Sequence, residues 1–342
     1  MIIIMSESKA MILGCAGTVL TKDELALYRD ERPWGFILFA RNLKEPAQIS
    51  DLVASMRDSV GRPDAPVLID QEGGRVQRIR PPMIERYPSA EVLGNLYRAD
   101  KGQGLRAAWL MSRLHAFDLM NLGINVDCLP VLDVPVEGAS NVIGDRAYGF
   151  DPVTVADMGK AAAAGLKAGG MLPVMKHIPG HGRGMADSHH ELPTVTVSRE
   201  ELEAHDFPPF AALKDELMAM SAHIVFTALD PERPATTSRT VIDEVIRGTI
   251  GFDGLLLSDD ASMNALKGTL QERAANIVAG GCDIVLHCNG LMEEMTQVVT
   301  EVPVLAGKAL QRARAVEAGF GQPDDADEAT LRAEFWSLLP AS

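Results

Sequence analysis

The sequence is poor in basic residues and in long apolar runs. It has 32 Lys and Arg against 47 Asp and Glu, which gives a formal net charge of −15. A basic face normally displaces counterions from nucleic acids and docks on anionic membranes, so this charge argues against both partners. No run approaches the roughly 18 apolar residues of a membrane span, and the apolar segment Met1–Met5 is too short for a signal-peptide core. We therefore expect a cytoplasmic protein.

Cysteines and nucleotide-binding motifs are also scarce. The four cysteines, Cys15, Cys128, Cys282 and Cys288, have no CxxC spacing, which favours free buried thiols in a reducing compartment. No GxGxxG follows an apolar run, and no GxxxxGKS or GxxxxGKT occurs. Without these motifs, the sequence does not support the common nucleotide-binding loops. We predict neither a cofactor nor a bound metal.

The sequence does contain a regular alternation of short apolar runs and longer amphipathic stretches. Parallel strands joined by crossover helices have this pattern. The capping-box patterns Thr21-x-x-Glu24 and Ser198-x-x-Glu201 mark two helix starts, and Ile49–Val60 carries an apolar stripe at helical spacing. Eight repeats in roughly 290 residues match an α/β fold of the TIM type, a (β/α)8 barrel, better than an open sheet. The eight predicted strands are Ala10–Gly14, Gly35–Phe39, Pro66–Asp70, Gly123–Asp127, Leu172–Lys176, His223–Thr227, Gly254–Ser258 and Cys282–Leu286.

The length of the chain fits one large α/β domain or two smaller ones. Because the eight repeats use most of it, we predict a single catalytic domain over residues 1–342. The remaining tail, about 304–342, is predicted to form one or two helices packed outside the barrel.

Polar side chains follow most of the predicted strands. In a barrel the carboxyl ends of the strands surround one mouth, where residues serve function, whereas the opposite end serves stability. Any one of these side chains could be an ordinary strand-end cap, so the prediction of a site depends on their recurrence. They are Arg41 and Asn42, Asp70, Asp133 somewhat later, Lys176 with His177, and Asp259 with Asp260.

The segment Lys176–Pro193 has the composition of an active site. It holds four histidines, a lysine and two carboxylates, and its three glycines prevent a regular helix, so we expect a loop above a strand end. Asp187 can accept the ring N–H of His189, raise its basicity and fix its tautomer. Asp259, at the end of a buried run, is a candidate nucleophile. A nucleophile opposite a proton donor is what a retaining glycosidase needs.

A second polar loop follows the third strand. Its carboxylate Asp70 can hold a pair of sugar hydroxyls, and its arginines can add charge-assisted donors. Together with four other motifs, this loop resembles the family 3 glycoside hydrolases, and among them the single-domain bacterial β-N-acetylglucosaminidases of cell-wall recycling. The five motifs occur in order between about Ala10 and Asn289. They are Asp70-Gln-Glu-Gly-Gly-Arg-Val-Gln-Arg78, Val142-Ile-Gly-Asp-Arg-Ala-Tyr148, Lys176-His-Ile-Pro-Gly-His-Gly182, Asp187-Ser-His189 and Leu257-Ser-Asp-Asp260.

The resemblance implies a role for each matching residue. Asp259 is expected to form a covalent glycosyl-enzyme, and His189 with Asp187 to act as the general acid/base. The resemblance implies no further role for His190, and a loop-shaping role for His181. The residues expected to bind N-acetylglucosamine are Asp70, Arg78, Arg146, Lys176 and His177.

The implied activity is retaining exo-β-N-acetylglucosaminidase activity on a small sugar or muropeptide, by a monomer. Another family 3 activity, such as β-glucosidase or β-xylosidase, is an alternative. A metal-dependent barrel hydrolase could use the four loop histidines, His177, His181, His189 and His190, although the first predicted strand supplies no ligand. A sugar-binding barrel without activity is disfavoured, because the expected catalytic residues are all present.

Overall fold

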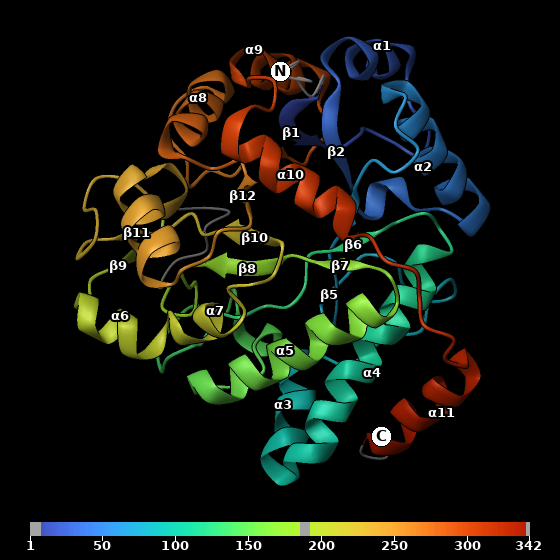
Figure 1. The fold of residues 1–342 in the computed structure, drawn as a ribbon, viewed down its shortest axis with the longest axis vertical. Coiled ribbons are helices and arrows are strands. Elements are labelled where there is room, and N and C mark those ends of the chain that lie inside the picture. Colours follow the sequence, from blue (N-terminus) through green and yellow to red (C-terminus); the bar gives the residue numbers. More distant parts are fainter. Residues whose placement is uncertain (1–7, 185–191, 340–342) are drawn as a thin grey trace.

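The computed structural model describes residues 8–184 and 192–339. Its centre is a parallel sheet in the order β7-β6-β3-β2-β1-β13-β12-β10-β8, in which β1 pairs with both β2 and β13 (Figure 1). The predicted α/β barrel of the TIM type is confirmed. The strands are β1 (Lys9–Leu13), β2 (Pro33–Leu38), β3 (Val67–Ile69), β6 (Val126–Asp127), β7 (Leu172–Pro173), β8 (Met175–Ile178), β10 (Met218–Ser221), β12 (Leu255–Asp260) and β13 (Ile284–His287).

The fifth predicted strand closes the barrel, although it is divided in two. Its first part, β7, pairs with β6, and its second part, β8, pairs with β10. The amide of Val174, between β7 and β8, donates to the Asp127 carbonyl (2.9 Å), and that of Lys176, within β8, donates to the Pro130 carbonyl (3.0 Å). This segment therefore has hydrogen bonds to both of its neighbours, as a closed barrel requires.

Helices surround the barrel in the order expected of strand and helix repeats (Figure 1). The helix α1 begins with the predicted capping box, because Thr21 accepts from the Glu24 amide (3.1 Å) and Glu24 accepts from the Thr21 amide (2.7 Å). At Ser198 only the first of the two bonds forms. The helices are α1 (Lys22–Glu31), α2 (Pro46–Val60), α3 (Ala90–Ala99), α4 (Lys101–Met120), α5 (Pro152–Ala168), α6 (Arg199–His205), α7 (Pro208–Ala212), the π-helix η4 (Val241–Thr249), α8 (Leu270–Gly280), α9 (Met292–Glu301), α10 (Gly307–Gly319) and α11 (Glu328–Leu338).

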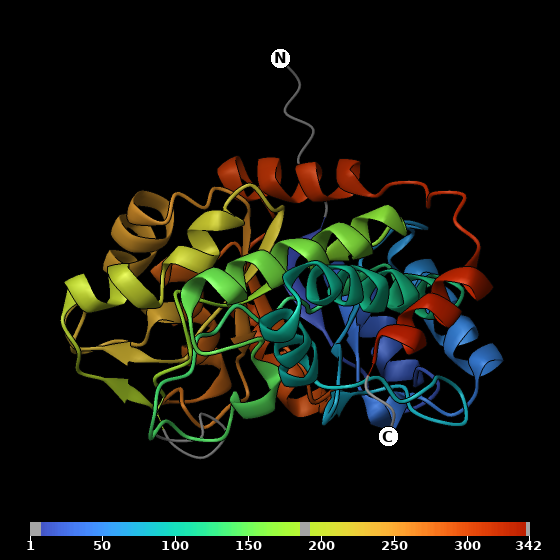
Figure 2. The same ribbon diagram turned by 90° about the horizontal axis from the view of Figure 1, so that it is seen from below.

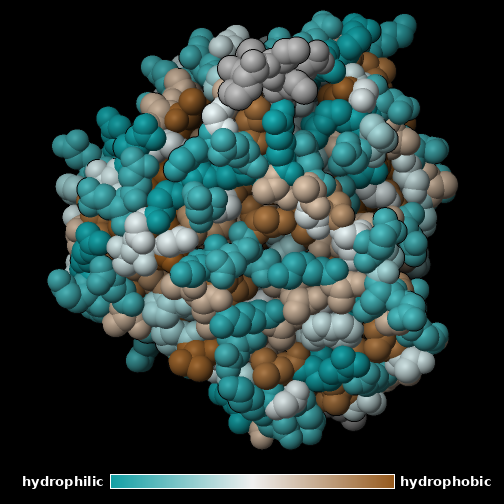
Figure 3. Space-filling model, viewed as in Figure 1, coloured by the Kyte–Doolittle hydropathy of each residue, from teal (hydrophilic) through white to brown (hydrophobic). Residues whose placement is uncertain are grey.

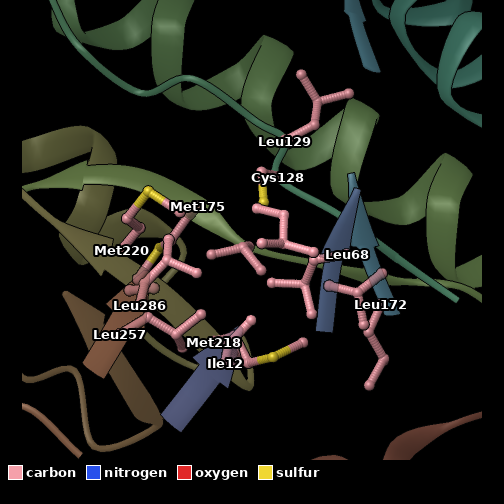
Figure 4. Packing of buried hydrophobic residues seen from close by; sticks show 14 of the residues in the cluster. Ile12, Leu68, Cys128, Leu129, Leu172, Met175, Met218, Met220, Leu257 and Leu286 are labelled. Atoms are coloured by element: carbon pink, nitrogen blue, oxygen red, sulfur yellow. The ribbon is translucent and has the colours of Figure 1, made fainter. Parts of the chain in front are cut away.

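The barrel interior is filled by side chains from several strands, so that it is a packed core. Figure 4 shows part of this packing, and its labelled residues are buried. Methionine is prominent there, and this flexible side chain fills irregular gaps. The labelled residues from the strands and their immediate ends are Ile12, Leu68, Cys128, Leu129, Leu172, Met175, Met218, Met220, Leu257 and Leu286.

The prediction for the sixth strand is wrong. The barrel strand is β10, Met218–Ser221, whereas Val225–Phe226 forms β11, which pairs outside the barrel with β9 (Thr194–Val195). Every position from Met218 to Phe226 is buried, so the apolar run is longer than the strand that it contains. The prediction chose the second half of this run because it holds the β-branched residues Ile224, Val225 and Thr227, which are common in strands. The strand preference of a residue depends on the surface against which it packs, and in this barrel the strand is formed by Met218–Ser221 instead.

Two helices of the tail pack outside the barrel, as predicted. The helix α10 lies across the amino-terminal end of the barrel, which is the upper edge in Figure 2. Its Glu317 accepts from the Trp34 indole (3.0 Å) and from Arg62 (2.6 Å). The helix α11 packs against α4, where Arg106 forms two hydrogen bonds with Glu334. The molecular face that carries α10 is mostly hydrophilic, with only scattered apolar patches (Figure 3).

The structure also describes the cysteines and the longest helices. The four cysteines are buried and unpaired. Within residues 8–184 and 192–339, no helix is both long and apolar enough to span a membrane. The assignment of the whole chain to one catalytic domain stays a prediction.

Candidate active site

A cavity of about 250 Å³ opens at the carboxyl ends of the barrel strands. We call it the sugar cavity, after the ligand that the sequence resemblance implies for these residues. Its apolar floor includes Ile37, Met220 and Leu286, so the filled barrel blocks it from below. Six of the residues predicted to form a site line it together, namely Asp70, Arg78, Arg146, Lys176, His177 and Asp259.

Asp70 holds two cations at one side of the sugar cavity. Lys176 Nζ donates to its Oδ1 (2.8 Å), and Arg78 donates to its Oδ2 (2.8 Å). Burial favours the neutral acid, but the two cations outweigh it and lower the pKa of Asp70 well below its ordinary value. The Arg78 guanidinium also stacks over the Phe39 ring, 4.9 Å from its centre. Asp70 is therefore an ionised carboxylate in a fixed position.

Glu72 is a residue of the site that sequence reasoning missed. It lies two positions after Asp70, and in an extended segment such residues point to the same side. Arg146 donates to both of its carboxylate oxygens (2.8 Å each), and Lys176 Nζ lies 2.6 Å from Oε1. Burial opposes ionisation, but Arg146 and Lys176 prevail and lower the pKa of Glu72 to about 2. The spacing of the two carboxylates was the signal that could have identified it.

Lys176 is therefore a buried ammonium between two carboxylates. Its side chain is 2% exposed. Burial alone would lower its pKa, but Asp70 and Glu72 raise it above the ordinary value. These two carboxylates explain how a lysine can directly follow core residues, because a buried ammonium is tolerated only when such partners neutralise it.

A third carboxylate, Asp133, holds His177 and His181, the two histidines of the predicted Lys176–Pro193 loop that lie in described residues. It accepts from the His177 ring Nδ1 (2.7 Å) and from the backbone amides of His177 (3.1 Å) and His181 (2.7 Å). Despite burial, His177 holds the pKa of Asp133 at about 2. Burial, with His177 nearby, lowers the pKa of His181 to about 4. His177 therefore presents the other edge of its ring to the cavity in a fixed tautomer.

The adjacent aspartates at the end of β12 have different roles. Asp260 accepts from the Ser262 amide (3.0 Å) and hydroxyl (2.6 Å) and from the Cys288 amide (3.1 Å), so it fixes the loop. Both aspartates line the sugar cavity, but Asp259 accepts one hydrogen bond, from the Asp260 amide (2.8 Å). Burial opposes ionisation of Asp259, but His223 and His177 lower its pKa. Asp259 is the better placed of the two to act as a nucleophile.

The comparison with protein families identifies the chain. Residues 20–316 match the profile of the glycosyl hydrolase family 3 N-terminal domain. The chain belongs to glycosyl hydrolase family 3. This match contains every motif on which the sequence-based resemblance depends, and it makes the protein a glycoside hydrolase.

Two bacterial proteins named β-hexosaminidase are similar over most of the chain. The β-hexosaminidase of Alkalilimnicola ehrlichii is 39% identical over 283 residues, which cover 82% of this chain and 80% of that protein. The β-hexosaminidase of Pseudomonas aeruginosa is 38% identical over 82% of each chain.

Two solved structures are similar to almost the whole chain. The structure of NagZ from Neisseria gonorrhoeae in complex with N-trifluoroacetyl-D-glucosamine has a TM-score of 0.83 and 31% identity, covering 97% of this chain and 96% of that one. A family 3 β-N-acetylglucosaminidase from Paenibacillus sp. has a TM-score of 0.85 and 29% identity, covering 97% and 68%.

Some residues predicted from the sequence do not line the sugar cavity, and others lie outside the described residues. Arg41 donates to the carbonyls of Cys15 (2.9 Å) and Cys288, so it ties together the loops after β1 and β13. Asn42 also donates to the Cys15 carbonyl (3.1 Å). The predicted acid/base pair, Asp187 and His189, lies outside the described residues, and so does His190. Their roles in this family 3 protein stay predictions.

The metal-dependent alternative receives no support from the described histidines. His177 and His181 both contact Asp133, but in residues 8–184 and 192–339 no three His, Cys, Asp or Glu side chains form a group able to hold a metal ion. The other two histidines of that alternative belong to the segment that the structure does not describe.

Proposed function

We propose that the protein is a retaining exo-β-N-acetylglucosaminidase, which removes terminal β-linked N-acetylglucosamine. The observation that carries this proposal is the position of Asp259 in one cavity with the buried array of Asp70, Glu72, Lys176 and Arg146. Relatives named β-hexosaminidase, and a similar NagZ structure in complex with an N-acylated glucosamine, support the choice of sugar.

The shape of the sugar cavity supports the proposed exo mode. Since its floor is closed by Ile37, Met220 and Leu286, the chain of a polysaccharide has no exit beyond the first sugar. Asp70 can accept hydrogen bonds from sugar hydroxyls, and Arg78, Lys176 and Arg146 can donate to sugar oxygens. Ion pairs among these side chains and Glu72 already fix their conformations, so they lose little conformational entropy when the sugar binds.

The reaction has two steps. In the first, the ionised Asp259 carboxylate attacks the anomeric carbon as the bond to the leaving oxygen breaks, and His189, oriented by Asp187, gives that oxygen a proton. In the second, a water attacks the same carbon and gives a proton to His189, and the bond to Asp259 breaks. The lowered pKa of Asp259 keeps the nucleophile ionised near neutral pH.

The natural substrate that we propose is a cell-wall muropeptide in the cytoplasm, with N-acetylglucosamine linked to 1,6-anhydro-N-acetylmuramic acid. This choice follows the resemblance to enzymes of peptidoglycan recycling. We propose that the enzyme acts as a monomer, with no nucleic-acid or membrane partner.

A comparison of aryl glycosides tests the function. We expect 4-nitrophenyl β-N-acetylglucosaminide to be hydrolysed much faster than the β-glucoside, β-xyloside or β-N-acetylgalactosaminide, with the same rate in a chelator. A preference for the glucoside or xyloside would select the other family 3 activity instead. Loss of activity in the chelator would select a metal-dependent hydrolase.

A further inference from the structure

His223 is a buried histidine at the mouth of the barrel that the proposed reaction does not use. It lies two residues beyond the carboxyl end of β10, whereas the predicted sixth strand placed it at the start of a strand. The residue is 0% exposed. Because the functional residues of a barrel gather at the carboxyl ends of its strands, the corrected position makes His223 a candidate for a role in the site.

Both ring nitrogens of His223 have partners. Nε2 lies 3.0 Å from the backbone carbonyl of Asp260, and Nδ1 lies 2.8 Å from the hydroxyl of Thr236, in η3 (Ala235–Thr237). A carbonyl oxygen can only accept, so Nε2 carries a proton and donates it to Asp260. The Thr236 hydroxyl also lies 2.9 Å from the Ala222 carbonyl, which fixes its position. The imidazole therefore links the end of β12 firmly to η3.

The end of β12 is irregular. From Leu257 to Asp260 this strand advances three residues, while its partner β13 advances two, from Ile284 to Leu286. One extra residue in one strand of a pair is a β-bulge, which changes the direction of the side chains around it. Consecutive side chains of a regular strand point to opposite faces, yet Asp259 and Asp260 both line the sugar cavity. The bulge explains how both aspartates reach it.

Ser258 closes the gap that the bulge leaves between β12 and β13. The Leu286 amide donates to the Ser258 hydroxyl (3.0 Å), and backbone pairing resumes where the Ala261 amide donates to the Leu286 carbonyl (2.9 Å). Because Ser258 and Leu286 are both buried, loss of the hydroxyl would leave this amide without its partner in a region closed to water. The bulge is therefore held by Ser258 on one side and by His223 on the other.

The position of the nucleophile depends on this bulge. In the part of the chain that the structure describes, the Asp259 carboxylate accepts a single hydrogen bond, from the Asp260 amide (2.8 Å). His223 holds the carbonyl of the same Asp260. Attack on an anomeric carbon requires aligned reacting atoms, and a displacement of about 1 Å can cost about a hundredfold in rate. Contacts that fix Asp260 therefore also fix the carboxylate of Asp259.

We propose that His223 and Ser258 are positioning residues for the nucleophile. They fix the bulge in β12 and so keep Asp259 aligned with the sugar, although neither of them lines the sugar cavity. This inference rests on the proposed function, in which Asp259 attacks the sugar. The effect concerns catalysis and not sugar binding, because Asp70 follows β3 and Lys176 belongs to β8, away from the bulge.

Replacing His223 by Leu and by Gln tests this role. Leu removes the donor to the Asp260 carbonyl, whereas the amide of Gln can still donate from close to the position of Nε2. With 4-nitrophenyl β-N-acetylglucosaminide we expect kcat and kcat/KM to fall together, about 10- to 100-fold, in His223→Leu and to stay within about fivefold of wild type in His223→Gln. The affinity for N-acetylglucosamine, measured by calorimetry, should stay within about twofold in both, because the nucleophile acts in the transition state.

Two buried serines supply a matched pair of variants. Ser258 and Ser238 are both 0% exposed, and the hydroxyl of each accepts from a backbone amide, that of Leu286 (3.0 Å) or that of Val241 (3.1 Å). Ser258→Ala should lower kcat about tenfold, because it loosens the bulge. Ser238→Ala removes an equivalent bond outside β12, so it should lower the thermal midpoint but leave kcat within about twofold of wild type.

The possible results separate this inference from the proposed function. Equal losses of kcat in Ser238→Ala and Ser258→Ala would overturn the inference, since any loosening of the fold would then slow the reaction. Equal activity of His223→Leu and His223→Gln, or a sugar affinity that falls in parallel with kcat, would overturn it as well. If His223→Leu does not fold, the two serine variants decide alone. Failure of wild type to hydrolyse any N-acetylglucosaminide would instead overturn the proposed function, and the same variants would then be compared on the β-glucoside or β-xyloside that it prefers.

Discussion

Replacing Glu72 by Gln tests whether the charged array under the sugar cavity stabilises the fold. Glu72 is 4% exposed and bonds to Arg146 and Lys176. Its pKa is lowered from 4.5 to about 2, which corresponds to about 3 kcal/mol of stability at neutral pH. Breaking a buried ion pair by removing one partner destabilises by about 3–5 kcal/mol. We expect the lower value, because Lys176 keeps Asp70 as a partner.

Urea unfolding of wild type and Glu72→Gln as a function of pH measures this effect. A depressed carboxyl pKa contributes stability above the ordinary pKa, and this contribution is lost as the pH falls through the folded-state value. The difference of about 3 kcal/mol should therefore be full above pH 4.5 and shrink as the pH falls toward 2. Asp133 contacts neither Glu72 nor Lys176 through its side chain, so its titration should largely cancel in the difference.

A surface pair provides the matched control. Glu334 makes the same two-bond contact with Arg106, at 2.7 and 2.6 Å, but the two side chains are 36% and 40% exposed. Glu334→Gln should therefore lower the free energy of unfolding by about 1 kcal/mol or less. The reasoning would be refuted by a Glu72→Gln protein that loses no more than Glu334→Gln at pH 7, or whose deficit is the same at pH 3 and pH 7.

Three further outcomes are expected. Asp259→Ala should abolish turnover and leave binding of N-acetylglucosamine largely intact, measured by calorimetry; a rate within about tenfold of wild type, or 1.4 kcal/mol in the barrier, would remove its assignment as nucleophile. His189→Ala should impair chitobiose hydrolysis far more than hydrolysis of 4-nitrophenyl glycosides, which need no proton on the leaving oxygen, and equal losses would contradict the acid role. Gly182→Ala should lower both the thermal midpoint and activity, because its Cβ would overlap the Val134 carbonyl, whereas Gly17→Ala, with open space around the new carbon, should change neither. A stable, fully active Gly182→Ala protein would show that the backbone there can move apart.

The barrel was predictable because its signal is repeated eight times. An error at one strand does not change the fold, as the sixth strand demonstrates. There the run Met218–Phe226 is buried throughout, so hydrophobicity could not separate the barrel strand from β11. Only the pairing of Met218–Ser221 with β8 and β12 makes that distinction, and pairing is a tertiary property.

The site was predictable where its residues stand at strand ends. Asp70, Lys176 and Asp259 share one cavity because barrel geometry gathers those ends. The contacts of Glu72 and Asp133 were not predictable from position alone. They depend on which cation or imidazole faces each carboxylate, and these partners, Arg146 and His177, come from elements far away in the sequence.

The pairing of β1 with β13 has a consequence for how the protein is made. Met11 lies beside Val285, so one edge of β1, the first of the described strands to be synthesised, stays uncovered until β13, the last of them, is made. At about 5–20 residues per second this wait lasts on the order of tens of seconds. During that time an apolar strand edge is open to pairing with other chains. Nascent chains that stop before Ile284 should therefore be bound by chaperones or aggregate, whereas chains released after β13 can close the barrel.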